Sequence, residues 1–130
     1  MGMQHDVVFG PAGVPEWVAV RDRLAARGYA VTMRMVDGDL SFPDELPKPG
    51  WTEIRVGLPT GGMVTVRRGA DRVSVVTWGN AAGDLLRGWN ALALAFAEVG
   101  GGGVSTGGAS LDAAGFAASA ELPEGFRRPS

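Results

Sequence analysis

Apolar residues recur with a helical period in two segments of the chain. The first segment covers residues 15–27 and has apolar residues at steps of three and four: Trp17, Val20 and Leu24. The second begins behind Asn80, which suits an N-cap, and has a longer stripe: Leu85, Trp89, Leu92, Phe96 and Val99. This spacing places the apolar side chains on one face of an α-helix. We therefore predict two amphipathic helices, each with one buried face.

Between these segments the pattern changes to a period of two. Residues 29–36 alternate, with Tyr29, Val31, Met33 and Met35 on one face. Two further alternating runs, at residues 51–58 and 63–68, and a mostly β-branched run at residues 72–78 follow, separated by short glycine-containing turns. A period of two is that of a strand with one buried face, and short turns join antiparallel neighbours. The sequence thus predicts a three-stranded meander at 51–78, a separate strand at 29–36, and a short first strand in the apolar run at 5–9.

The predicted elements follow a β-α-β-β-β-β-α order. Two helices with one apolar stripe each can both be buried on one face of a mainly antiparallel sheet. We therefore predict an α+β fold with a 4–5-stranded sheet and two helices on one face, forming a single domain over residues 1–103. If the strands at 5–9 and 29–36 are parallel, the helix between them makes a right-handed crossover.

Two segments lie outside this regular pattern. Residues 42–50 contain three prolines among acidic residues, which excludes a central strand or a helix and predicts an ordered surface loop. Residues 104–130 are rich in Gly, Ala and Ser and predict a C-terminal extension, with residues 110–121 as the one stretch that suits a short helix. If the protein has a specific site, we expect one of these two segments to form it.

Composition excludes several classes of function. The chain has no cysteine and one histidine, which rules out disulfides, zinc thiolate sites and a multi-histidine centre. A net charge of −2 disfavours a nucleic-acid partner. No apolar run is long enough for a membrane span, and residues 1–9 do not resemble a signal peptide. We expect a cytoplasmic protein without a cofactor, and the preference for Arg over Lys suggests a bacterial source.

The acidic residues before and within the proline-rich segment are candidates for metal binding. Carboxylate oxygens are ligands for hard divalent cations, and four acids lie close together in sequence: Asp37, Asp39, Asp44 and Glu45. Acids and glycine are also common turn formers, which is the simpler explanation. His5 and Asp6 could pair as a base and its orienting acid, but adjacent residues of a strand point to opposite faces. We expect His5 to be a surface residue.

The leading hypothesis is a non-enzymatic protein that acts by binding another protein, as an immunity-like protein, an adaptor or a subunit of a larger complex. Tryptophan and arginine are typical anchors at protein interfaces, and the meander carries Trp51, Trp78, Arg55 and Arg67. Phe116 and Phe126 are apolar residues of the extension that could dock in a partner. The alternatives are a carboxylate-based enzyme or metal-binding domain, and a carrier with an apolar pocket between helices and sheet. The sequence leaves a homodimer open.

Overall fold

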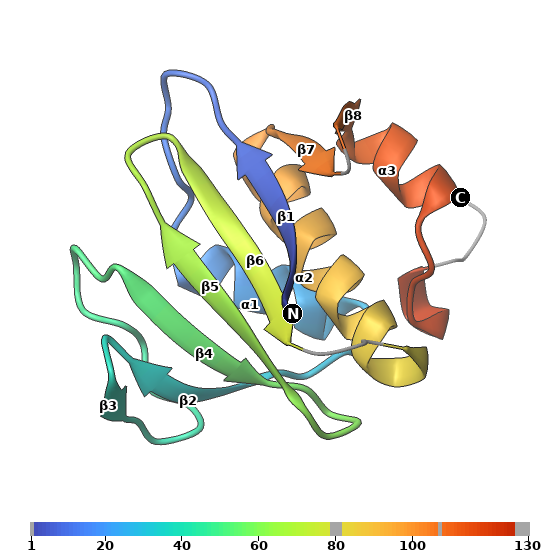
Figure 1. The fold of residues 1–130 in the computed structure, drawn as a ribbon. Coiled ribbons are helices and arrows are strands. Elements are labelled where there is room, and N and C mark those ends of the chain that lie inside the picture. Colours follow the sequence, from blue (N-terminus) through green and yellow to red (C-terminus); the bar gives the residue numbers. More distant parts are fainter. Residues whose placement is uncertain (1, 79–81, 107, 127–130) are drawn as a thin grey trace.

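The computed structural model describes residues 2–78, 82–106 and 108–126 (Figure 1). Within them the chain forms an eight-stranded sheet, three α-helices and a short 3-10 helix. The elements are, in chain order, β1 (Gly2–Val8), α1 (Trp17–Ala26), β2 (Thr32–Val36), β3 (Asp39–Leu40), β4 (Glu53–Gly57), β5 (Met63–Arg68), β6 (Arg72–Trp78), α2 (Gly83–Gly100), β7 (Gly103–Thr106), β8 (Ala109–Asp112), α3 (Ala113–Ser119) and η1 (Glu124–Phe126).

The strands are ordered β3-β2-β4-β5-β6-β1-β7-β8, and every neighbouring pair is antiparallel. The predicted α+β class and the meander, which is β4 to β6, are confirmed. The predicted 4–5 strands and two helices were too few. The additional strands are β3, which has only two residues, and β7 and β8 of the Gly-rich segment, whose composition gives no clear alternation.

The C-terminal segment adds strands to the same sheet as the N-terminus. β7 pairs with β1 on the side opposite β6, so the first strand lies inside the sheet rather than at its edge. Glycine allows this close approach, since a Cβ on Gly102 would lie 2.6 Å from the carbonyl oxygen of Val8. Residues 103–106 and 108–126 therefore pack against the rest of the chain.

The connection from β1 through α1 to β2 spans most of the sheet. Successive antiparallel pairings make β1 and β2 run in the same direction, but β4, β5 and β6 lie between them. A β-bulge then changes the pattern of β2, because Met33 and Met35 face consecutive residues of β4, Val56 and Arg55. Met33 is buried and Met35 is turned to the other face, so the predicted common face of Tyr29 to Met35 ends at the bulge.

The helices lie together on one face of the sheet, with α2 between α1 and α3 (Figure 1). The predicted stripe of α1 is confirmed, since its three residues are all buried. The single buried face predicted for α2 was too narrow, because residues 88–97 are buried all round the helix. Small residues on its other faces let α1 and α3 approach closely. Asn80 lies outside the described residues, and α2 begins at Gly83 without a side-chain cap.

Candidate functional site

One face of the sheet carries no helix within the described part of the chain, and we call it the open face. Ile54 and Val56 of β4 are buried toward the helices, so the residues that alternate with them point the other way. The strand register then aligns two rows of side chains across this face. One row is Leu40, Met35, Arg55, Thr65, Val76 and Gln4, and the other is Glu53, Arg67, Ser74, Asp6 and Ser105.

Large apolar side chains remain exposed on the open face. Trp78, at the end of β6, is 57% exposed, and the guanidinium of Arg67 lies 5.8 Å from the centre of its ring. Met63, which pairs with Gly57 on the neighbouring strand, is also exposed. A tryptophan stacked with an arginine is the kind of group that anchors protein interfaces.

The loop after β3 extends this surface beyond the sheet edge. We call residues 39–50 the edge loop, because they comprise β3, the strand at one edge of the sheet, and the segment that follows it. Leu40 is 87% exposed, Phe42 is 76% exposed and Leu46 is also exposed. Single exposed apolar residues are common on protein surfaces, but this loop exposes three within seven positions, with Leu40 beside Met35 of the open face and Leu46 beside the start of α1.

Backbone hydrogen bonds hold the edge loop in one shape. The amide of Ser41 donates to the carbonyl of Arg34 (3.0 Å), and that of Met33 donates to the carbonyl of Pro43 (2.9 Å). Phe42 N also donates to Glu45 Oε1 (3.1 Å), and Glu45 N donates back to Phe42 O. The loop therefore presents its apolar side chains from an ordered backbone, which lowers the entropy lost on binding.

Asp37 anchors the base of the edge loop. Its φ of 48° lies in the left-handed region, which Asp and Asn tolerate better than most residues. Its Oδ1 accepts hydrogen bonds from Thr52 N (2.8 Å), Thr52 Oγ1 (2.9 Å) and Glu53 N (2.9 Å). These hydrogen bonds, led by the backbone amides and aided by nearby Lys48, lower the pKa of Asp37 from 3.8 to about 2.

The acids predicted to bind metal are not gathered into one site. In the part of the chain that the structure describes, no three acidic or histidine side chains lie close enough to hold an ion. Asp37 and Glu45 instead accept hydrogen bonds from backbone amides. Asp39 and Asp44 are exposed in the loop. The acids of this segment thus shape the loop or lie on its surface.

The anchoring role of Asp37 predicts a specific response to acid. Because its folded pKa is lowered, its contribution to stability is complete above about pH 4 and is lost as the pH falls toward 2. We expect Asp37→Asn, which tolerates the same φ, to lose less stability than the wild type between pH 5 and pH 2.5, measured by urea unfolding. Asp44→Asn, at an exposed site without hydrogen bonds among the described residues, should keep the wild-type response. Equal pH dependence of all three proteins would contradict the anchoring role.

The interface residues predicted from sequence divide into two groups. Trp78, Arg55 and Arg67 lie on the open face. The other three are buried: Trp51, Phe116 and Phe126. Trp51 is covered by the guanidinium of Arg68 at 4.6 Å. The sequence reasoning missed Leu40, Phe42, Leu46 and Met63 as surface groups, although leucine and phenylalanine among prolines and acids were a visible signal.

His5 is buried, so its predicted surface position was wrong. Its ring stacks on Trp89, with 3.7 Å between ring centres, and meets the edge of Phe116. The side-chain nitrogen of Asn90 donates to Glu121 O (2.8 Å), which leaves Asn90 Oδ1 to accept from His5 Nε2 (2.8 Å). Asp6 faces the open side and bonds to Ser74 (2.7 Å), as strand alternation predicts.

Burial lowers the pKa of His5, and the hydrogen bond to Asn90 and the charge of Asp6 only partly oppose this. The unfolded chain therefore binds a proton more readily than the folded chain, so stability should fall as the pH drops below 6.5 toward the lower folded pKa. We expect the free energy of unfolding of His5→Phe to change less than that of the wild type between pH 7.5 and pH 5.5. The measurement is urea unfolding followed by circular dichroism, and parallel curves for both proteins would contradict the assignment.

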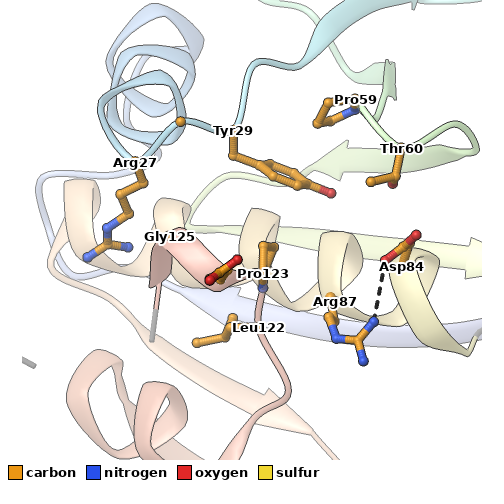
Figure 2. Close-up of a pocket in the computed structure, with 11 residues that line it drawn as sticks. Arg27, Tyr29, Pro59, Thr60, Asp84, Arg87, Leu122, Pro123 and Gly125 are labelled. Carbon is orange, nitrogen blue, oxygen red and sulfur yellow. Dashed lines mark hydrogen bonds and ion pairs between the residues drawn. The ribbon is translucent and has the colours of Figure 1, made fainter. Parts of the chain in front are cut away.

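A polar cleft of about 920 Å³ lies at the end of the molecule where the C-terminal segment meets the first turn of α2 (Figure 2). Tyr29 points into this region from the loop after α1, and burial raises the pKa of its hydroxyl. Asp84 and Arg87 form an ion pair at 3.4 Å, and Glu124 adds a further charge. The charged lining differs from the apolar pocket between helices and sheet that a carrier of apolar ligands needs.

Comparison with known proteins gives no relative. No protein-family model, curated protein or solved structure matches the chain. None of the helices in the described residues has the length and apolar character needed to cross a membrane. Any proposal about function therefore depends on the surfaces and side chains described above.

Proposed function

We propose that this chain is a non-enzymatic bacterial accessory protein that binds another protein in the cytoplasm, as an adaptor, an immunity-like protein or a subunit of a complex. The observation that carries the proposal is the group of exposed apolar side chains on the open face and edge loop: Leu40, Phe42, Leu46, Met63 and Trp78. Helices cover the opposite face of the sheet, and Leu46 lies beside the start of α1, so Leu40, Met63 and Trp78 are the exposed apolar side chains that the sheet itself presents on the open face.

The arrangement of these side chains supports binding to a protein. Aromatic and arginine side chains supply much of the binding energy at protein interfaces, and Trp78 and Arg67 already lie against each other. The ordered backbone of the edge loop holds Phe42 in place before a partner arrives. Charged side chains such as Arg55 and Glu53 lie on the same face as the apolar groups, and protein interfaces combine polar and apolar contacts in this way.

The two alternative functions have weaker support. For a carboxylate-based enzyme or metal-binding domain, Asp37 and Glu45 would have to give up hydrogen bonds that shape the loop. For a carrier of small apolar ligands, the cleft beside Tyr29 has four charged side chains in its lining, Arg27, Asp84, Arg87 and Glu124. The exposed apolar surface favours a protein partner over both.

The test is affinity purification of the tagged full chain from the cells that produce it. We expect a protein to be retained in stoichiometric amount by the wild type and lost when Phe42→Ser and Trp78→Ser are combined. The matched control combines Ala26→Ser and Ala114→Ser, two exposed positions on the helices, and should retain the partner. Circular dichroism establishes that all three proteins are folded. Retention of the same partner by the Phe42 and Trp78 variant would overturn the proposed surface.

A further inference from the structure

Exposed apolar groups and an arginine lie side by side at one end of the open face. Thr65 pairs with Val76, and continuing this register by two residues sets Met63 beside Trp78. Both of these side chains are exposed, at 43% and 57%. The guanidinium of Arg67 lies 5.8 Å from the centre of the Trp78 ring. A group that packs on Trp78 is therefore also within reach of a positive charge.

Two further arginines lie beside these apolar groups. Gly57 pairs with Met63, and the place where a Cβ of Gly57 would stand is 3.2 Å from Cδ of Arg34, so the stem of Arg34 crosses the open face there. Arg55 is two positions from Gly57 on the same strand, so it points to the same face about 7 Å away. The three arginines thus come from β2, β4 and β5, which are neighbours in the sheet.

These arginines outnumber the carboxylates that pair with them. In the described part of the chain Glu53 is the one carboxylate that does so, with Arg67 at 3.1 Å and Arg55 at 3.9 Å. Arg34 has no ion pair among the described residues. The side chains of Arg55 and Arg67 are 41% and 50% exposed, so both can donate to an incoming carboxylate. Three positive charges against one negative charge make this part of the face electropositive.

Building on the proposed protein-binding function, we infer that the partner presents carboxylates beside an apolar side chain to this part of the open face. The apolar side chain packs on Trp78 and Met63, and the carboxylates pair with the guanidinium groups, whose planar fork matches a carboxylate. An exposed ion pair contributes little by itself. The charges therefore orient the partner and speed its approach, while the apolar contact supplies most of the binding energy.

Phosphate groups also pair with arginine, but the rest of the face disfavours a nucleic-acid strand. Such a strand needs a positively charged groove that follows its backbone. Glu53 lies among the arginines, and Asp6, which accepts a hydrogen bond from Ser74 at 2.7 Å, lies farther along the same face. A short acidic segment of a protein can avoid these two carboxylates, whereas a polyphosphate that crosses the face meets them.

NMR titration of the isotope-labelled full chain tests the inference with defined probes. The first probe is a peptide with a central Leu-Phe pair flanked by glutamates, and two comparison peptides have lysine or glutamine in place of glutamate. We expect the acidic peptide to shift the indole N–H signal of Trp78 and to bind about fivefold or more tighter than the comparison peptides. Salt at about 0.5 M should remove most of this difference, because it screens exposed charges. A deoxythymidine oligomer serves as the nucleic-acid probe.

Charge variants show whether the arginines cause the preference. Arg55→Gln combined with Arg67→Gln should bind the acidic peptide no better than the glutamine peptide. Arg55→Glu combined with Arg67→Glu should prefer the lysine peptide, a reversal that a loss of folding does not produce. The matched control, Arg21→Gln with Arg87→Gln, removes the same charge from α1 and α2 and should keep the wild-type preference.

Four results would each overturn the inference: no shift at Trp78 with any peptide, equal binding of the three peptides, an unchanged preference in the glutamine variant, and tighter binding of the deoxythymidine oligomer at the same signals. The proposed function fails separately, because it depends on the capture of a protein through Phe42 and Trp78 and not on the charge of a peptide. Capture that persists without a preference for the acidic peptide would leave the proposed function standing and remove only the acidic partner.

Discussion

A chain shortened to residues 1–103 should fail to fold. The deletion removes four buried apolar side chains, at Val104, Phe116, Leu122 and Phe126. Burial of these side chains contributes about 6 to 12 kcal/mol, which is comparable with the roughly 5 to 15 kcal/mol that stabilises a whole domain. The deletion also leaves one side of β1 without its backbone partner. We expect no cooperative unfolding transition in urea and a collapsed spread of amide signals in NMR.

The control for this deletion is a chain that ends at Phe126. It keeps every buried residue described above and should unfold with nearly the wild-type midpoint. The pair of proteins also tests whether residues 1–103 form a domain alone, as the composition of the C-terminal segment suggests. A cooperative transition in the 1–103 chain would show that the segment is an extension after all.

Replacing Asn90 by alanine should lower the free energy of unfolding by about 2 to 4 kcal/mol. Asn90 joins three parts of the chain, because it lies on α2, accepts from His5 of β1 and donates to the carbonyl of Glu121. The substitution leaves the buried Nε2 of His5 and the part-buried carbonyl of Glu121 without their partner, and an unpaired buried polar group costs about 1 to 3 kcal/mol. Urea unfolding at pH 7.5 gives the measurement.

A double-mutant cycle separates the two hydrogen bonds of Asn90. In the background of His5→Phe, Asn90→Ala should cost less than in the wild type, because only the bond to Glu121 remains to be lost. The same cost in both backgrounds would show that the contact between His5 and Asn90 adds nothing to stability.

The elements with strong apolar periodicity were predictable from sequence, and those held by backbone contacts were not. The two last strands of the meander begin and end at the predicted residues, because alternating apolar side chains and the turns between them define both. β7 and β8 consist mainly of small residues, and Val104 is the one fully buried side chain among them. Their place in the sheet depends on pairing with β1, which is about a hundred residues away in the chain and leaves no local pattern.

The candidate surface was only partly predictable for a related reason. Trp51 and Trp78 both stand at an end of a strand, and local pattern does not distinguish them. Trp51 is covered because the segment around Val14 and Arg68 lies against it, while Trp78 has no such cover in the described structure. His5 posed the same difficulty, since it becomes buried only when α2 brings Trp89 and Asn90 against β1.

The central place of β1 in the sheet has a consequence for how the chain folds. Gly2 pairs with Trp78, and Val8 pairs with both Arg72 and Gly103, so β1 has partners only among residues made much later. During synthesis β1 must wait, with both of its edges unpaired, until most of the chain has been made. Such long-range pairing slows folding and prolongs the time during which strand edges can aggregate. The meander β4 to β6, with its short turns, is therefore where we expect folding to begin.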